Sequence, residues 1–276
     1  MDIDQKPEAY LRRKEVMVVA NFHLEIGTIS RGKCQSVTNS VSYISGEKLH
    51  DDYNGKFYYN SRHDVLQCQI FLPHNAPYTF HHLQNLCYEI DKAERRYDAR
   101  TAREFKGSLP NELSFPEQSR IVHEYISNNF TSHGLCAIAA IHEGRNEVNP
   151  KCNNPHVHII VPTRSVGPDG FTKKKNREWN KREYINIWRE DWANVQNRAY
   201  ERNGLDIQIS HESLEVQGIK DREPTIHLSQ IDWQKEKHGV RTIAGDKKRE
   251  IEKRNEERSR QFQAERELAC ELELSR

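Results

Sequence analysis

Two histidines stand at the head of an apolar stretch in "NNPHVHIIVP", residues 153–162. If this stretch is a β-strand, His156 and His158 project from one face and Val157 from the other, because side chains alternate along a strand. Two imidazoles about 7 Å apart can share one metal ion if a neighbouring strand supplies a third ligand. An isolated H-x-H pair also occurs as ordinary polar decoration of a strand edge, so the pattern alone leaves both interpretations open.

His142 is the candidate third ligand. It ends the apolar stretch 135–142, which we expect to be a strand. If this strand forms a hairpin with the one that begins at His156, all three imidazoles converge. Three neutral imidazoles suit Zn²⁺, Mn²⁺, Ni²⁺ or Co²⁺ and leave coordination positions open. An open site of this kind is what Lewis-acid chemistry on a phosphate requires.

A tyrosine in "RGKCQSVTNSVSYISGEKL", residues 31–49, is a candidate nucleophile. A tyrosine hydroxyl can attack a phosphodiester and form a phosphotyrosine link, which keeps the bond energy for later resealing. Tyr43 lies in a polar, basic setting that would favour a phenolate. The chain has 11 tyrosines, however, and Tyr53, Tyr58 and Tyr59 are close by. The residue pattern alone therefore does not single out Tyr43.

The elements that must position these side chains follow from hydrophobic spacing. Amphipathic helices are expected at 79–98 with Thr79 as N-cap, at 114–130 after a capping box from Ser114 to Glu117, and at 184–199. The middle of 30–55 is a candidate polar helix. Strands are expected at 21–29, 66–72, 103–109, 135–142, 156–163 and 206–210. The irregular order and hairpin-like connections predict an α+β fold, with a central antiparallel β-sheet flanked by helices.

Composition bounds the rest of the chain. It has 276 residues, of which 35% are hydrophobic and 30% charged, and its net charge is +1. The net charge therefore gives no overall electrostatic attraction for nucleic acid. A basic binding surface would have to be local. The six cysteines form no C-x-x-C pair, which favours reduced thiols in a cytosolic protein and argues against a cysteine-rich zinc finger. No apolar run is long enough to span a bilayer and none resembles a signal peptide, so we expect no membrane insertion.

Three segments are expected along the chain. Residues 1–18 form an N-terminal extension, 19–230 the main domain, and 231–276 a charged tail that is helical or partly disordered. Pairs such as Glu250 with Arg254, four residues apart, favour a solvated helix in the tail. The tail has few apolar positions, which favours a solvated helix or disorder. Contact with DNA, an accessory protein or a second copy is the alternative.

The order of several blocks over 19–230 resembles the MobA/MobL family of plasmid mobilisation relaxases, a branch of the HUH single-strand DNA endonucleases. The H-x-H preceded by Asn-Pro, with an upstream Ile-His, is a specific signature, and the other blocks strengthen it. The matching stretches are "SRGKCQSVTNSVSYISGEKL", "IFLPHNAP", "IDKAERRYDARTAREFKGSLPNEL", "AIHE…NNPHVHIIVPTR", "WREDWANVQNRAYERNG" and "HESLEVQGIKDREPTIHLS".

This resemblance implies roles for particular residues. His142, His156 and His158 match the family's metal ligands, and Tyr43 matches its nucleophile. Glu104, in "AREF", matches an acidic residue near the active site that could orient a ligand histidine or help take the tyrosine proton. The cofactor implied is a divalent metal ion, Mn²⁺ or Mg²⁺ first, with Ni²⁺, Co²⁺ or Zn²⁺ as alternatives.

The resemblance also implies a function. Family members nick one strand at a plasmid's origin of transfer, stay linked to the 5′ end through a phosphotyrosine, and reseal the strand after conjugation. Expected partners are single-stranded DNA at that origin, accessory relaxosome proteins and a conjugative coupling protein. The expected location is the bacterial cytoplasm, with export alongside the DNA. A related HUH initiator of rolling-circle replication or transposition is the alternative function.

Three features depart from the family pattern. About 18 residues precede the first expected strand, Cys87 stands where many members have tryptophan, and the chain stops at residue 276. Many members continue into a long primase or helicase region. We therefore expect a relaxase domain alone, with altered packing around Cys87.

Two basic stretches are candidates for holding DNA. Arg31 and Lys33 could hold phosphates near the tyrosine. A second stretch could track phosphates and stack a base, although both stretches also fit a solvated loop. Trp188 and Trp192 are expected in the core instead, because they share the apolar face of the long helix. The second stretch comprises Lys173, Lys174, Lys175, Arg177 and Trp179.

Overall fold

The computed structural model describes residues 22–145, 153–226 and 228–274. The chain divides into two compact units, residues 1–211 and 212–276. The expected extension at 1–18 lies outside the described residues, and the expected boundary after residue 230 remains a prediction. Within the described part, every helix is too short or too polar to cross a bilayer.

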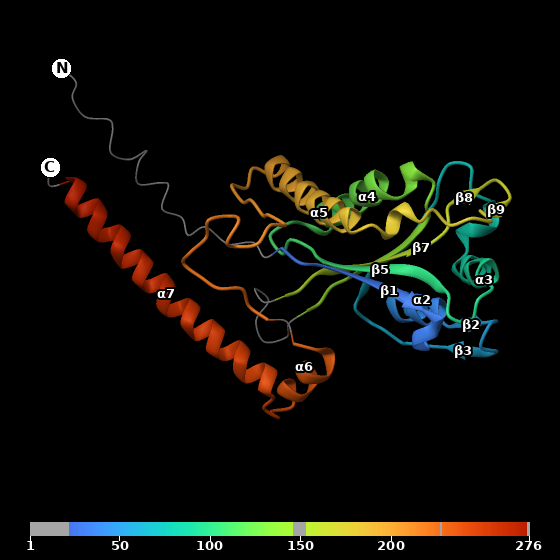
Figure 1. The fold of residues 1–276 in the computed structure, drawn as a ribbon, viewed down its shortest axis with the longest axis horizontal. Coiled ribbons are helices and arrows are strands. Elements are labelled where there is room, and N and C mark those ends of the chain that lie inside the picture. Colours follow the sequence, from blue (N-terminus) through green and yellow to red (C-terminus); the bar gives the residue numbers. More distant parts are fainter. Residues whose placement is uncertain (1–21, 146–152, 227, 275–276) are drawn as a thin grey trace, which may run out of the picture. The chain divides into compact units, whose positions relative to one another are not determined.

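The first unit is built around an antiparallel sheet of five strands in the order β1-β5-β7-β6-β4. Every neighbouring pair in it runs antiparallel, which confirms the predicted α+β architecture (Figure 1). The central strand is β7, with β5 and β6 on either side of it and β1 and β4 at the edges. The bounds are β1 Leu24–Ser30, β4 Val65–Phe71, β5 Arg100–Ser108, β6 Ala137–His142 and β7 His156–Pro162.

Helices cover both faces of this sheet, α4 and α5 on one and α2 and α3 on the other (Figure 1). Their bounds are α2 Val37–Ser45, α3 Leu83–Ala93, α4 Phe115–Asn129 and α5 Arg182–Arg202. Two small hairpins pair β2 with β3 and β8 with β9. Their strands are β2 Leu49–Asp51, β3 Lys56–Tyr58, β8 Val166–Gly167 and β9 Gly170–Phe171, and the 3₁₀ turns are η1 Arg31–Lys33, η2 Tyr78–His81, η3 Thr131–His133 and η5 Glu178–Asn180.

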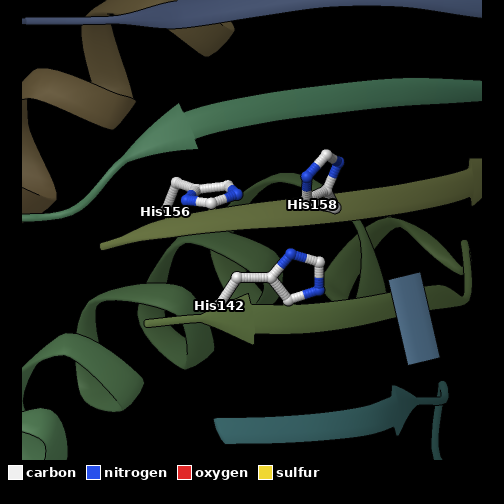
Figure 2. A group of neighbouring side chains, drawn as sticks. All are labelled: His142, His156 and His158. Atoms are coloured by element: carbon white, nitrogen blue, oxygen red, sulfur yellow. The ribbon is translucent and has the colours of Figure 1, made fainter. Parts of the chain in front are cut away.

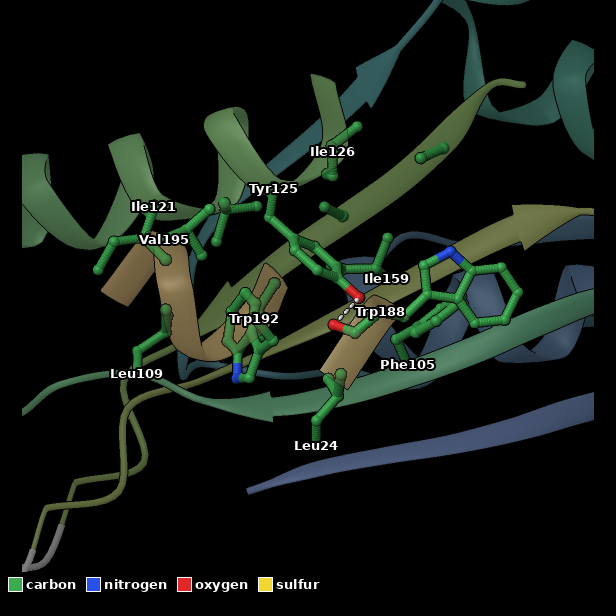
Figure 3. Packing of buried hydrophobic residues seen from close by; sticks show 14 of the residues in the cluster. Leu24, Phe105, Leu109, Ile121, Tyr125, Ile126, Ile159, Trp188, Trp192 and Val195 are labelled. Atoms are coloured by element: carbon green, nitrogen blue, oxygen red, sulfur yellow. Dashed lines mark hydrogen bonds between the residues drawn. The ribbon is translucent and has the colours of Figure 1, made fainter. Parts of the chain in front are cut away.

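The face under α4 and α5 is an aromatic core (Figure 3). Trp192 and Tyr125 are fully buried, and their rings meet edge to face with centroids 4.9 Å apart. The hydroxyl of Tyr125 donates to the carbonyl of Trp188 at 3.2 Å, so its polar end is satisfied. Phe105 from β5 meets Trp188 at 5.2 Å. Trp188 and Trp192 are thus core residues, as predicted.

Gly107 allows this core to approach the sheet closely. A Cβ atom on Gly107 would lie 2.6 Å from the Trp192 ring. No side chain fits that space, so the indole packs directly on the β5 backbone.

The face under α2 and α3 is aliphatic where it is buried. Val41 and Ile44 of α2 and Leu86 of α3 pack against Ile138 of β6 and Ile160 of β7. Ser36 caps the start of α2 by accepting from the backbone N–H of Asn39. This packing fixes α2 over the middle strands and leaves their ends beyond the helix available for polar side chains.

The predicted helix over 79–98 is wrong at both ends. Thr79 lies in η2, and α3 begins only at Leu83 after an extended His82. The helix ends at Ala93 because the buried Arg31 guanidinium takes the carbonyls of Asp91 and Glu94. Residues beyond Glu94 therefore leave the helical path before β5.

Two further local predictions are corrected. The helix expected at 114–130 begins after Ser114, but the Ser114 side chain makes no capping hydrogen bond. The strand expected at 206–210 is absent. The side-chain amide of Asn197 bonds the backbone N–H and carbonyl of Ile209 at 2.9 Å each, so a helix residue takes the place of a partner strand.

The second unit contains α6 Gln230–Lys237 and α7 Ile243–Leu274, which confirms a charged helical tail over its described part. The expected pair of Glu250 with Arg254 is replaced. Arg254 instead binds Glu223 at 2.6 Å, and the backbone of Glu223 exchanges hydrogen bonds with the Asn255 side chain. The segment before α6 is thereby fastened along α7.

Candidate active site

Strand pairing brings the three predicted histidines together (Figure 2). His142 ends β6 directly opposite His156, the first residue of β7, and His158 lies opposite Ala140. The ring centroids are 4.9 to 5.3 Å apart. One nitrogen from each ring can be chosen so that all three lie within 4.8 Å of one another. The hairpin expected from sequence is therefore present, and it gathers the imidazoles.

Backbone carbonyls fix the tautomers of two of these rings. Nε2 of His142 lies 2.8 Å from the carbonyl of Ile44, and Nδ1 of His156 lies 2.8 Å from the carbonyl of Asn154. A carbonyl only accepts, so each of these nitrogens carries the proton. The lone pairs are then on Nδ1 of His142 and Nε2 of His156, which is the arrangement that metal-binding imidazoles need.

Two buried nitrogens of the triad lack a hydrogen bond. Nδ1 of His142 and Nδ1 of His158 make no hydrogen bond although both are buried. A buried nitrogen without a partner costs about 1–3 kcal/mol, so its presence calls for a ligand. A divalent cation fits this donor set, because neutral imidazole is a ligand for all the candidate transition metals.

Burial keeps His142 and His156 neutral. It lowers the pKa of His142 to about 4 against the opposing effect of the Ile44 carbonyl, and the nearby charge of Arg62 adds to the lowering. Burial also lowers the pKa of His156, again with a contribution from Arg62. Both rings are therefore unprotonated near neutral pH, when they can donate lone pairs to a cation.

Glu104 approaches the triad from β5. It shares a sheet face with Lys106, which pairs with His158, and its carboxylate lies 3.7 Å from Nδ1 of His158. Burial would raise the pKa of Glu104, but His158 and Lys106 more than offset this and the pKa is lowered. An ionised carboxylate thus faces the His158 ring from the side.

Tyr43 lies beside the triad, near the end of α2. Its side chain is 37% exposed, and its ring meets the His158 ring edge to face with centroids 6.1 Å apart. The next residue, Ile44, supplies the carbonyl that holds His142. Gly46 ends the helix in the left-handed conformation, with φ of 74°. At this end of α2 the Ile44 carbonyl is available to accept a hydrogen bond from outside the helix.

Arg62 is a site residue that the sequence did not reveal. Its guanidinium lies 4.6 Å from the centre of the Tyr43 ring and forms two hydrogen bonds with Asp64, at 2.8 and 2.6 Å. The hydrogen bonds from Arg62 lower the pKa of Asp64 to about 2. The Asp64 carbonyl accepts from the N–H of Glu143, next to His142. No sequence motif predicts a role for Arg62. The loop before β4 that carries it is positioned by tertiary contacts.

Arg31 and Trp179, two of the predicted DNA-binding residues, are buried and held by contacts within the protein. Arg31 is 9% exposed and is held by Asp91 and by backbone carbonyls. Trp179 is 8% exposed and stacks on Trp188, so its ring is not free to stack on a base. Lys33 is exposed at the end of η1.

The remaining predicted basic residues line an open groove of about 1080 Å³ at the other end of the middle strands. The groove lies where Arg100 begins β5 and Thr163 follows β7. Lys175 is partly engaged, because it pairs with Glu94 at 2.8 Å. Two acidic residues, Glu94 and Asp98, face ten basic ones: Lys92, Arg95, Arg96, Arg100, Arg103, Arg164, Lys173, Lys174, Lys175 and Arg177.

Comparison with known proteins places these features in a family. The model of the MobA/MobL family matches residues 35–238. This range includes the three histidines of the triad as well as Tyr43 and Glu104. A probable mobilization protein MobA of Bifidobacterium longum is 28% identical over 252 residues, covering 76% of this chain. A conjugal transfer protein TraA of Rhizobium radiobacter is 27% identical over 260 residues, covering 82% of this chain.

A solved structure shows the same fold. It comes from work on the molecular basis of vancomycin resistance transfer in Staphylococcus aureus. It is 27% identical to this chain, has a TM-score of 0.63, and matches 70% of this chain and all of its own. The chain spans only 43% of the Bifidobacterium relative and 23% of the Rhizobium relative.

Proposed function

Because the chain belongs to the MobA/MobL family, we propose that it is a DNA relaxase that nicks one strand at a plasmid origin of transfer and later reseals it. The observation that carries this proposal is Tyr43 beside three convergent histidines, with ring centroids of Tyr43 and His158 6.1 Å apart. A nucleophile next to an open metal site is the combination that phosphoryl transfer to a side chain requires.

The reaction is a transesterification at one phosphodiester. The Tyr43 hydroxyl loses its proton, and its oxygen forms a bond to phosphorus while the bond to the 3′ oxygen breaks. The 3′ oxygen takes up a proton and leaves, and the 5′ phosphate stays on Tyr43. One phosphoester bond replaces another, so no ATP is consumed and the reverse reaction reseals the strand.

His142, His156 and His158 would hold the divalent cation. A cation held there would supply Lewis-acid assistance to the phosphate and would offset charge that develops in the transition state. Mn²⁺ suits these ligands and the phosphate oxygens together, while Mg²⁺ prefers oxygen ligands alone. We therefore propose Mn²⁺ as the first ion to test, followed by Mg²⁺, Ni²⁺, Co²⁺ and Zn²⁺.

Glu104 and Arg62 support the reacting groups. Glu104, 3.7 Å from His158, is placed to fix the orientation of that ring. Arg62 places a positive charge 4.6 Å from the centre of the Tyr43 ring, where it can offset negative charge that develops in the transition state. The proton from Tyr43 leaves to solvent or to a nearby base, and the 37% exposure of Tyr43 allows either.

The partner is single-stranded DNA around the nick. The basic groove at the other end of the middle strands, with Lys173, Lys174 and Arg177 exposed along it, would hold phosphates of the same DNA. Lys33 is a further candidate phosphate contact. Accessory relaxosome proteins and a coupling protein remain expected partners of such a relaxase.

One experiment tests this function. The full chain is incubated with Mn²⁺ and a labelled single-stranded oligonucleotide carrying an origin of transfer, and covalent adducts are resolved on a denaturing gel. Wild type should form an adduct, Tyr43→Phe should form none, and Tyr53→Phe, which removes the hydroxyl of another exposed tyrosine, should match wild type. An adduct with Tyr43→Phe, or none with wild type under any of the five metals, would refute the assignment.

The same gel separates mobilisation from the alternative HUH functions. Oligonucleotides from a rolling-circle replication origin and from a transposon end are tested beside the origin of transfer. Preferential cleavage of either would replace the mobilisation role while leaving the chemistry intact.

A further inference from the structure

The β2–β3 hairpin exposes aromatic rings that the fold does not use. Phe57 is 63% exposed and Tyr59, just after β3, is 64% exposed. Phe57 pairs with His50 across the hairpin, and both lie on the face opposite to Leu49, which is buried. Tyr59 follows Phe57 by two residues, one beyond the end of β3, and continued alternation would direct it to the same side. We call Lys48, His50, Phe57 and Tyr59 the hairpin face.

A cation lies over the aromatic surface. The ammonium of Lys48 is 4.8 Å from the centre of the Phe57 ring, and the rings of Phe57 and His50 are 4.7 Å apart. Tyr53, at the turn of the same hairpin, is different, because the guanidinium of Arg31 lies 3.7 Å from the centre of its ring. Lysine beside open aromatic faces is the composition of surfaces that bind single-stranded nucleic acid.

Two of the four carboxylates near the hairpin face are engaged inside the protein. Asp51 is fully buried and bonded to Ser36 and Asn54. Asp64 is paired with Arg62, and Asp52 lies 3.1 Å from Nδ1 of His50. Asp51 and Asp64 are thus engaged within the protein, whereas Asp52 contacts His50 of the hairpin face and Glu47, next to Lys48 in sequence, is exposed. Lys48 supplies the positive charge of this face.

The hairpin face is joined to the helix of the candidate nucleophile. The side chain of Asn60 donates to the side chains of Asn39 and Ser42, both at 3.3 Å. Asn39 and Ser42 are four and one residues before Tyr43 in α2, and positions four apart share a helix face. The segment that carries Tyr59 is therefore held beside Tyr43, and DNA at Tyr43 has the hairpin face as its neighbour.

We propose that Phe57 and Tyr59 form a stacking platform for unpaired bases next to the phosphodiester that Tyr43 attacks. The proposal rests on the proposed function for its location. It adds a binding site that contacts the bases rather than the phosphates. Stacking on the platform immobilises the strand on one side of Tyr43, so the scissile phosphate is held at the triad while its flanking bases stay unpaired. Stacking does not depend on base identity, so the platform binds without strong sequence preference.

The test compares two probes that share phosphates but differ in bases. One is fluorescein-labelled oligothymidine of roughly 12 nucleotides, and the other is an abasic oligomer of the same length. Affinities are measured by fluorescence anisotropy with the full chain in EDTA, so no cleavage occurs. The double substitution Phe57→Ala with Tyr59→Ala should raise the Kd for oligothymidine about 10-fold or more, since it removes both stacking rings. Its Kd for the abasic oligomer should equal that of wild type.

Matched variants sharpen the comparison. Phe57→Trp with Tyr59→Trp keeps the rings and should keep or tighten oligothymidine binding. Tyr78→Ala removes an aromatic ring that is 79% exposed elsewhere on the surface, and it should leave both affinities unchanged. Lys48→Ala should weaken both probes, because it removes a charge and no ring.

Several results would overturn the platform. They are an unchanged oligothymidine Kd in the double alanine variant, an equal loss for the abasic oligomer, or an equal loss in Tyr78→Ala. A shift in sedimentation of the double variant with unchanged DNA affinity would instead show that the hairpin face joins two copies of the chain. The adduct assay on the same variant, at saturating oligonucleotide, distinguishes the two proposals: adducts with unchanged affinity reject the platform alone, and no adduct from wild type rejects the function.

Discussion

On β7, Val157 and Ile159 point into the aromatic core under α4 and α5, whereas His156 and His158 point to the face that α2 and α3 cover. The same alternation divides β5, where Phe105 faces the core and Glu104 faces the histidines. One face fills its space with rings that contact one another. The other leaves imidazole nitrogens without partners. The middle strands thus use one backbone for rigidity on one side and chemistry on the other.

The triad is a place where the fold sacrifices folding stability. Among the described residues, four buried side-chain nitrogens lack a hydrogen bond: two belong to the triad, one is Nε1 of Trp192 in the aromatic core, and one is Nε of Arg31. A buried polar atom without a hydrogen bond costs about 1–3 kcal/mol, and the packed face opposite can offset that cost. A ligand at the triad should therefore stabilise the fold, while changes in the aromatic core should weaken the fold without touching the chemistry.

The largest expected effect separates the two faces directly. Trp192→Ala empties a fully buried site and should lower the free energy of unfolding by about 3–5 kcal/mol. Tyr43→Phe should change it by less than about 0.5 kcal/mol while abolishing the covalent adduct. Urea unfolding and the adduct gel measure the two effects. Equal destabilisation by both variants would remove the distinction between the faces.

The histidine face should respond to acid. The folded pKa of His142 is about 4 and its unfolded value is 6.5. The unfolded state therefore binds the proton first, and the stability that is present above about pH 6.5 is lost as pH falls toward 4. At 1.36 kcal/mol per pKa unit the loss reaches up to about 3 kcal/mol for this group. Urea unfolding of the metal-free protein across that range measures it.

His142→Gln serves as the control for the acid response, because glutamine keeps a polar side chain that does not titrate. The pH slope between 6.5 and 4 should be smaller in His142→Gln than in wild type. An unchanged slope would assign the acid response to other groups.

A close backbone approach should make the core face sensitive to a single methyl group. Gly107→Ala would push against Trp192 and should cost about 1–3 kcal/mol of unfolding free energy. Gly27→Ala, on the next strand, has no atom closer than 3.9 Å to the new Cβ and should be tolerated. Thermal unfolding of the two variants compares them, and equal melting temperatures would mean that the Trp192 ring moves aside freely.

The smallest effect concerns the residue that flanks the triad. Glu104→Gln keeps the shape but removes the charge near His158, and it should weaken Mn²⁺ binding about 10-fold. Isothermal titration calorimetry with Mn²⁺ measures this without DNA. Glu25→Gln removes an exposed carboxylate from neighbouring β1 and should leave the affinity unchanged. The same loss in both variants would show only a general effect of charge.

Periodicity predicted much of the fold, but it did not predict the ends of elements. Alternation placed β6 and β7, and helical spacing placed the buried tryptophans of α5. The helix over 79–98 was misjudged because its end is set by the Arg31 guanidinium, which comes from η1 far earlier in the chain. Such long-range contacts leave no local pattern.

The sequence by itself determined which residues share a face. The shared face of His156 and His158 follows from the period of two in a strand, whereas the pairing that sets His142 opposite His156 is seen only in the folded sheet. Only the tertiary structure decided what surrounds them. The carbonyls of Ile44 and Asn154 choose the tautomers, and Arg62 reaches Tyr43. These contacts depend on how separate elements pack, because backbone groups look alike in sequence and acquire a role only through position.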